Sequence, residues 1–345
     1  MSASSFRSPA GQQGRIVVVL STVVILLAAG AAAMLWHLYQ QPLPTRDERV
    51  EIRVPAGASA RAIAGALREQ GVEVNTELFV AVARLTEATK SLRAGRYEIL
   101  RGMRLRDVID RLRRGETLKE KLTIVEGWTL REMRAALAAT PLLRPDSKKM
   151  TDAEILAAVG ATESHAEGLF APDTYVFDAG SSDLDILRQS YRAQQARLRR
   201  AWDERSADLP LKTPYEALIL ASIVEKETGQ DAERARIAAV FINRLRLGML
   251  LQTDPAVIYG LGDRFDGNLR KRDLTADTPY NTYTRGGLPP TPIALPGPAS
   301  IGATLNPAPT RALYFVARGD GTSHFSESLA EHNRAVVKYQ LGGQR

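Results

Sequence analysis

Two glutamates near the end of one predicted helix are the residues best suited to acid–base chemistry. Glu225 and Glu227 lie in the run 223–228, directly after a stretch in which most side chains are apolar. Residues two apart on a helix point about 200° away from each other. The two carboxylates therefore cannot flank one glycosidic bond as the paired acids of an ordinary glycosidase do.

The helical spacing favours Glu227 over Glu225 as a general acid. Glu227 continues an apolar row that begins at Leu220, whereas Glu225 continues a more mixed row. A carboxyl group at the end of an apolar row is desolvated, which raises its pKa and keeps it protonated, as a general acid requires. In the alternative interpretation both glutamates are exposed, and Glu227 is paired with a basic neighbour such as Arg234.

The helix that carries these glutamates has recognisable ends. Thr213 is a good N-cap, Pro214 suits the first helical position, Glu216 completes a capping box, and Gly229 is a plausible stop. A helix that is apolar on most sides is usually buried in a domain core. A second helix is predicted over about 232–247, followed by a turn over 251–255.

The segment 279–309 is rich in proline and glycine and is predicted to be a long loop. Within it, Tyr280, Asn281, Thr282 and Tyr283 combine flat apolar faces with hydrogen-bonding groups, as the wall of a sugar-binding groove does. The alternative is a proline-rich cover over the domain. A strand over 312–317 and a closing helix over 326–340 are expected to follow.

The region before residue 140 contains a weak repeat of a β-prone run, a glycine and a helical stretch. Its three copies cover 54–70, 99–114 and 125–139. Small strand–helix units of this kind build LysM-like carbohydrate-binding modules, although a general α+β domain that positions a second domain fits equally well. Residues 140–165 are polar with scattered helix formers, and 185–202 are predicted to be helical.

The N-terminal region is predicted to contain a membrane anchor. Residues 16–38 include no Asp, Glu, Lys or Arg, and about 20 apolar residues suffice to cross a bilayer as a helix. A cleaved signal peptide is the alternative, but its apolar region would span only about 7–15 residues. Arg7 and Arg15 precede the segment, so residues 1–15 are expected in the cytoplasm, with a linker over 39–49 and the remainder outside.

Composition limits the other classes of function. The chain has 345 residues, a net charge of +7, 44% hydrophobic residues and no cysteine. A folded protein of about two domains is expected, without disulfides or thiolate chemistry. Its four histidines lie far apart, and no zinc-finger spacing, P-loop, dinucleotide fingerprint or Gly-x-Ser-x-Gly elbow is present. We therefore expect no metal, no organic cofactor and no nucleic-acid partner.

Several ordered motifs resemble the endolytic murein transglycosylase (YceG-like) family. The catalytic-region motifs are ASIVEKET (221–228), VFINRL (240–245), LQTDP (251–255), VIYG (257–260), YNTY (280–283), GLPP (287–290) and LYFVA (313–317). Upstream, AGRY (94–97), VEG (125–127) and PDTY (172–175) also match. The likeness extends along essentially the whole chain after the apolar segment, except for about 140–165.

The resemblance implies an α+β protein with a transmembrane helix, a LysM-like subdomain over 50–122 and a mainly helical catalytic domain over 123–345. It implies cleavage inside nascent peptidoglycan strands, between N-acetylmuramic acid and N-acetylglucosamine, with 1,6-anhydro ends. The inner membrane and possible cell-wall synthases are the implied partners. By position in its motif Glu227 is the catalytic acid. The candidate supporting residues are Glu225, Asn243, Gln252, Thr253, Asp254, Asn281, Thr282 and Tyr283.

Two other functions remain compatible with the residues. The first is a muramidase, a hydrolase in which a second carboxylate such as Asp254 activates water. The second is a peptidoglycan-binding scaffold without catalytic activity. The products of the reaction separate the first alternative from a transglycosylase, since only the latter leaves anhydro-muramoyl ends.

Overall fold

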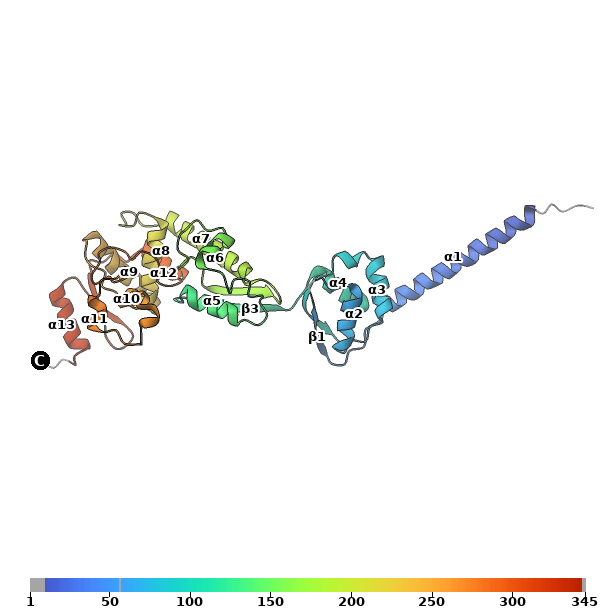
Figure 1. The fold of residues 1–345 in the computed structure, drawn as a ribbon, viewed down its shortest axis with the longest axis horizontal. Helices are drawn as coiled ribbons and strands as arrows, with labels where there is room; N and C mark the ends of the chain where they lie inside the picture. The colour runs from blue at the N-terminus through green and yellow to red at the C-terminus, as the bar shows by residue number, and fades with distance from the viewer. Residues whose placement is uncertain (1–9, 56, 343–345) are drawn as a thin grey trace, which may run out of the picture. The chain divides into compact units, whose positions relative to one another are not determined.

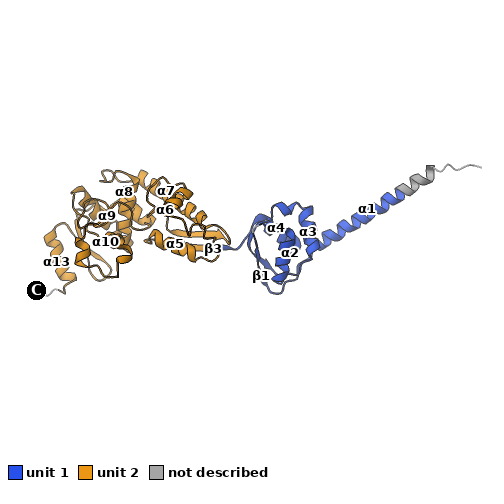
Figure 2. Cartoon of the chain, in the orientation of Figure 1, with its two compact units in different colours: residues 1–120 blue, residues 121–345 orange. Residues whose placement is uncertain are grey.

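The computed structural model describes residues 10–55 and 57–342. The chain is a mixed α+β protein that divides into two compact units, residues 1–120 and 121–345 (Figure 2). The first unit contains α1 (Ala10–Gln40), β1 (Arg49–Val54), α2 (Ala60–Glu69), α3 (Thr76–Leu85), η1 (Ala88–Lys90), β2 (Gly95–Leu100) and α4 (Leu105–Arg114).

The second unit is mainly helical (Figure 1). Its elements are β3 (Lys119–Ile124, which begins at the boundary), α5 (Leu130–Ala139), α6 (Asp152–Val159), β4 (Asp173–Asp178), α7 (Asp183–Asp203), α8 (Pro214–Glu227), α9 (Asp231–Arg246), α10 (Asp254–Leu261), η2 (Gly262–Arg264), α11 (Lys271–Thr275), α12 (Pro298–Leu305), β5 (Tyr314–Ala317), β6 (Ser323–Ser326) and α13 (Leu329–Tyr339).

Helix α1 carries the predicted membrane segment. Its part Val18–Gln40 is long and apolar enough to cross a membrane, and no residue of that window is buried inside the protein. Large apolar side chains exposed in this way are stable in lipid but not in water. The helix is therefore consistent with a single-pass anchor over the predicted segment 16–38, although a signal sequence passes the same test of length and composition.

The first unit is built on the antiparallel pair β1–β2, in which Ile52 lies opposite Tyr97. Alternate side chains of β1 are buried, as a strand with one solvated face requires. They join α2, α3 and α4 in one core, where Leu67 and Ile109 are fully buried. The first two predicted strand–glycine–helix copies are thus β1–α2 and β2–α4, while the third, β3–α5, continues into the second unit, where β3 pairs with β4.

The core of the second unit surrounds α8. Every residue of α8 from Ala217 to Val224 is buried, and the helix packs against α7, α9, α10 and α12. Thr213 caps its start by accepting a hydrogen bond from the Glu216 N–H, as predicted. The Glu216 carboxylate accepts from the Lys212 N–H instead of completing the capping box. The helix ends at Glu227, two residues before the predicted stop at Gly229.

Two sequence predictions downstream need correction. The segment 251–255 is not only a turn, because Thr253 is the N-cap of α10 and Pro255 lies in its first turn. The segment 279–309 is not a continuous loop, because α12 begins at Pro298 within it and packs on α8 and α9. Proline in the first turn of a helix costs no hydrogen bond. Both helices therefore form although each has a proline near its start, which in the sequence resembles the proline of a turn or loop.

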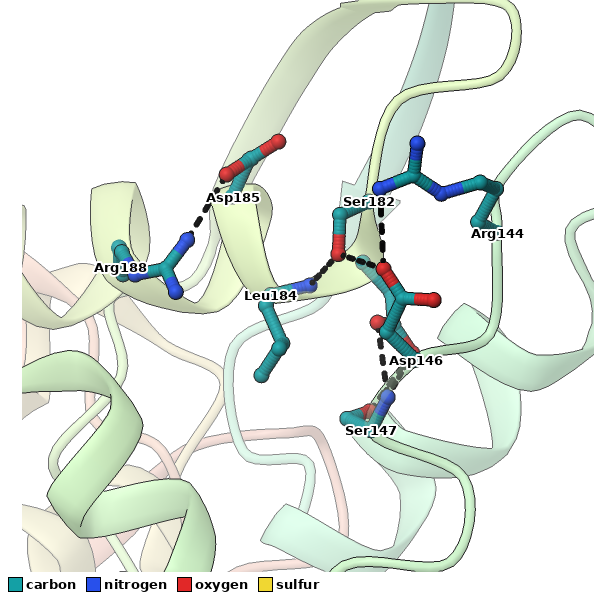
Figure 3. Close-up of polar contacts among 8 residues, drawn as sticks. Arg144, Asp146, Ser147, Ser182, Leu184, Asp185 and Arg188 are labelled. Carbon is teal, nitrogen blue, oxygen red and sulfur yellow. Dashed lines mark hydrogen bonds and ion pairs between the residues drawn. The ribbon is translucent and has the colours of Figure 1, made fainter.

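The unassigned stretch 140–165 is fixed to the start of α7 by polar contacts (Figure 3). Ser182, the N-cap of α7, donates to Asp146 at 2.6 Å, and Arg144 forms an ion pair with the same carboxylate at 3.1 Å. The buried Asp183 accepts hydrogen bonds from the backbone N–H and the hydroxyl of Ser147. The stretch then forms α6, which packs on α7.

Gly168 allows two loops of the second unit to approach each other. It has a positive φ of +78°, and a Cβ there would lie 2.4 Å from Cβ of Pro292. Gly180 has a similar φ of +89°, but a Cβ there would meet nothing within 4 Å. Both glycines therefore have a left-handed backbone, but only at Gly168 would an added Cβ collide with a neighbouring residue.

We therefore expect Gly168→Ala to destabilise the second unit more than Gly180→Ala does. The left-handed backbone alone costs about 1–2 kcal/mol for alanine, and forced overpacking adds about 1–3 kcal/mol. Urea unfolding, followed by the fluorescence of Trp128 and Trp202, measures both changes in the free energy of unfolding. Equal losses at the two positions would contradict the close approach at Pro292.

Candidate active site

Glu227 lines a cavity of about 670 Å³ in the second unit. The cavity walls come from the end of α8, from α9 and the start of α10, from the 279–297 loop, and from β5 and α13. Its lining includes Glu227, Phe241, Arg244, Gln252, Asp254, Tyr283, Tyr314, Phe315, His332, Asn333 and Gln340. Aromatic rings and neutral amides lie among aliphatic and charged side chains of the lining, and pockets that bind sugars or other polar rings have such groups.

The carboxyl group of Glu227 is held by one hydrogen bond. The Thr253 hydroxyl donates to its Oε1 at 2.5 Å, and no other described residue donates to either oxygen. Burial raises the pKa of Glu227 to about 7. The Thr253 bond lowers this pKa, nearby Asp254 raises it, and Arg244 lowers it. The side chain is nonetheless partly exposed. Glu227 can therefore exchange a proton with a bound molecule near neutral pH.

Thr253 is fixed by the predicted loop around Thr282. The Thr253 N–H donates to the Thr282 hydroxyl at 3.0 Å, and that hydroxyl donates to the Thr253 carbonyl at 3.3 Å. The neighbouring Gln252 has a left-handed φ of +52° and donates its N–H to the Thr282 carbonyl. A non-glycine residue in this conformation is uncommon and requires strong local support. Thr253 and Thr282 are both buried, and neither lines the cavity.

Asp254 and Tyr283 form a hydrogen-bonded pair in the same cavity. The Tyr283 hydroxyl donates to Asp254 Oδ1 at 2.6 Å. Burial and the Asp254 carboxylate raise the pKa of Tyr283, so its phenol remains neutral. The fold thus brings three of the residues predicted from the sequence to the cavity that Glu227 lines: Gln252, Asp254 and Tyr283.

Arg244 is a buried cation beside the cavity that the sequence analysis did not select. Its Nε donates to the Leu313 carbonyl at 2.7 Å, and its Nη1 donates to the Leu250 and Leu251 carbonyls and to Gln252 Oε1. Burial lowers its pKa, but an arginine remains charged in proteins. One signal was available: Arg244 falls on the buried row of α9, seven residues after Ile237.

The side-chain amides of Asn243 and Asn281 both donate to backbone carbonyls. Asn243 does not line the cavity; its amide donates to the carbonyls of Thr310 and Ala312. The fully buried Asn281 donates to three backbone carbonyls, and its side-chain oxygen accepts the Tyr283 N–H at 2.9 Å. Neither amide is free to hold a sugar, but Asn281 shapes the loop that carries Tyr283.

Glu225 points to a different part of the unit from Glu227, as the helical geometry required. Its Oε2 accepts the Gly297 N–H at 2.9 Å, where α12 begins. Its negative charge also raises the pKa of Glu126, after the larger effect of burial. Arg234 pairs with Asp231 and not with Glu227, so the exposed, paired alternative for Glu227 is not observed.

Another glutamate, the buried Glu167, also has a pKa raised to about 7 by burial. It differs from Glu227 because both of its oxygens are occupied. Oε1 accepts the Leu130 N–H at 2.9 Å, and Oε2 accepts the Tyr259 hydroxyl at 3.1 Å. Glu167 therefore joins α5 to α10, and the pKa alone does not identify the reactive carboxyl group. No cluster of three metal-ligating side chains occurs among the described residues.

The raised pKa of Glu227 predicts a pH-dependent cost in stability. Well below pH 4.5 this residue is neutral in both states; as the pH rises through 4.5 to about 7, the unfolded chain releases its proton before the folded one does. Stability is therefore lost over this interval, by at most about 3 kcal/mol. We expect Glu227→Gln to become more stable than the wild type between pH 5 and pH 8 in urea unfolding. A difference between the two proteins that stays constant with pH would contradict the desolvated carboxyl group.

Comparison with known proteins places the chain in a family. The endolytic murein transglycosylase of Bacillus subtilis is 33% identical over 308 residues, covering 84% of each chain. The enzyme of that name from Streptococcus pneumoniae is 27% identical and covers 84% of this chain and 58% of the relative. A crystal structure of a yceG-like protein from Listeria monocytogenes is 32% identical, with a TM-score of 0.55, and covers 83% of this chain and 98% of that one. The family model described as YceG-like matches residues 52–338, and the chain belongs to the YceG-like family.

Proposed function

We propose that this protein is an endolytic peptidoglycan lytic transglycosylase, a lyase, in which Glu227 acts as the only acid–base group. The observation that carries the proposal is the Glu227 carboxyl group, desolvated to a pKa of about 7 and facing a cavity large enough for sugar rings. The curated relatives named endolytic murein transglycosylase supply the substrate class. No second group is needed, because the nucleophile belongs to the substrate.

In the first step, protonated Glu227 donates its proton to the oxygen between N-acetylmuramic acid and N-acetylglucosamine, and the bond from C1 to that oxygen breaks. In the second step, the Glu227 carboxylate accepts the proton of the C6 hydroxyl of the muramic acid. The C6 oxygen bonds to C1 and closes the 1,6-anhydro ring. The proton count balances, water is not consumed, and Glu227 is again protonated.

Neighbouring residues prepare Glu227 for both roles. The Thr253 hydroxyl keeps one carboxyl oxygen in place, and the Arg244 charge stabilises the carboxylate that exists between the two steps. The neutral Tyr283 phenol and the Gln252 amide lie in the cavity as hydrogen-bonding groups for sugar hydroxyls. In this scheme Thr282 and Asn281 act only by positioning these groups.

The location of the protein follows from the same proposal. Residues 1–15 lie in the cytoplasm, α1 anchors the chain in the bacterial inner membrane, and the second unit reaches nascent strands outside. The first unit, with its small strand–helix copies, acts as a LysM-like module that holds glycan. Cleavage inside nascent strands would end their elongation, which makes cell-wall synthases the expected partners.

One observation favours a muramidase as the second candidate function. Asp254 lies in the same cavity as Glu227 and is oriented by Tyr283, so a second carboxylate is present that could activate water. The two mechanisms differ in their products, since hydrolysis leaves reducing ends and transglycosylation leaves anhydro ends. A scaffold without activity would produce neither.

We expect the purified full-length chain in detergent to release anhydro-muramoyl fragments from murein, and Glu227→Gln to reduce the rate by at least about 100-fold, because general acid catalysis contributes this much or more. Mass spectrometry of the released fragments measures both. Glu225→Gln is the matched control on the same helix, and it should retain most of the activity. Reducing ends would contradict the lyase mechanism, and a fully active Glu227→Gln would contradict the assignment of the acid. If Glu227→Gln is inactive but still sediments with murein, binding and chemistry are separate.

The two neighbours of Glu227 should move the pH dependence in opposite directions. Thr253→Val removes a hydrogen bond that lowers the pKa of Glu227, so the alkaline limb of kcat/KM should shift to higher pH. Asp254→Asn removes a negative charge that raises this pKa, so the limb should shift to lower pH. Shifts of about half to one pH unit are expected in assays from pH 5 to pH 9. Shifts in the same direction would show that Glu227 does not control this limb.

A further inference from the structure

The wall of the cavity formed by β5 and α13 has no role in the mechanism above. It brings together Tyr314 of β5 and His332 of α13, whose rings are stacked with centroids 5.2 Å apart and planes 25° apart. Both residues line the same cavity as Glu227, and both are only partly buried. Two stacked rings at a cavity wall offer a flat apolar surface together with a polar edge.

This ring pair is fixed relative to the proposed acid. The guanidinium carbon of Arg244 lies 5.0 Å from the centroid of the Tyr314 ring, within the range of a cation–π contact. Arg244 in turn bonds the carbonyls that precede Thr253 and influences the charge of Glu227. Helix α9 therefore helps to position His332, because its Arg244 contacts Tyr314 and Tyr314 stacks on His332.

His332 is a neutral hydrogen-bonding group in these surroundings. Burial, with smaller effects from Arg244 and His324, lowers the pKa of its imidazole. Its Nδ1 is buried without a hydrogen-bond partner among the described residues. A neutral imidazole has one N–H donor and one acceptor nitrogen. Such a ring can bond a hydroxyl or an acetamido group without placing a second positive charge beside Arg244.

We propose that His332 and Tyr314 form a binding surface for an N-acetylated hexosamine ring of the glycan strand beside the cleaved bond, with His332 hydrogen-bonded to that sugar. This inference rests on the proposed function, because it takes the cavity to hold a glycan. A pyranose ring has a flat apolar face and a polar rim, and the stacked pair with the adjacent Asn333 amide complements both. Helix α13 is then part of the substrate site and not only a closing element.

Binding is measured separately from turnover. The full-length chain carrying Glu227→Gln is titrated by calorimetry with soluble N-acetylated glycan strands freed of stem peptides. Adding His332→Phe keeps a stacked ring but removes the hydrogen bond, and should weaken binding about 3- to 10-fold, the worth of one hydrogen bond. His332→Gln keeps a hydrogen-bonding group and should recover part of the lost affinity. In the Glu227-containing enzyme, His332→Phe should raise KM and leave kcat nearly unchanged.

His324 supplies the matched control. It lies on β6, its ring is tilted by 39° against that of Tyr339 with centroids 5.7 Å apart, and it does not line the cavity, so His324→Phe should change neither affinity nor KM. Melting temperatures of all variants show whether α13 remains packed. Unchanged affinity in His332→Phe, or an equal loss in His324→Phe, would overturn the role of His332. A fully active Glu227→Gln would overturn the proposed mechanism instead, while the binding comparison would still stand.

Discussion

The hydrogen bond from Thr253 to Glu227 joins the parts of the molecule on which the proposed chemistry depends. Helix α8 is buried along most of its length, so its last residue places a carboxyl group at the edge of a hydrophobic core. A carboxylate there is costly unless it is hydrogen-bonded or paired with charge. Thr253 provides the bond, and Thr282 holds Thr253 in place. Three segments distant in the sequence therefore determine how readily Glu227 gives up its proton.

Arg244 balances that site electrostatically. Its buried guanidinium is stabilised by three backbone carbonyls and by Gln252, and no carboxylate of the described residues bonds it directly, so its charge remains close to the cavity. Because Arg244 does not neutralise Glu227 in a direct ion pair, Glu227 keeps its raised pKa. The same side chain lies against Tyr314, so one residue of α9 connects the acid to the α13 wall.

Patterns local in the sequence predicted much of the framework. The apolar spacing identified α8 and α9 within a few residues of their ends, and the same spacing separated Glu227 from Glu225, because helical geometry depends only on neighbours along the chain. The prediction failed where local signals are ambiguous. The residues of α10 and α12 contain proline near their starts and were interpreted as turn and loop. Asn243 and Asn281 were candidate sugar ligands, and only the structure shows that both amides donate to backbone carbonyls.

The amino-acid sequence by itself determined the apolar segment long enough to cross a membrane, the helix that carries Glu227 and, through its ordered motifs, the family. Each of these depends on residue type and spacing over short distances. Only the tertiary structure decided that Thr253 bonds Glu227 and that Arg244 and the His332–Tyr314 pair line the cavity of Glu227. These residues come from α9, the α10 cap, β5 and α13, and folding brings them together through core packing. A pKa set by burial and by such distant neighbours cannot be read from one helix alone.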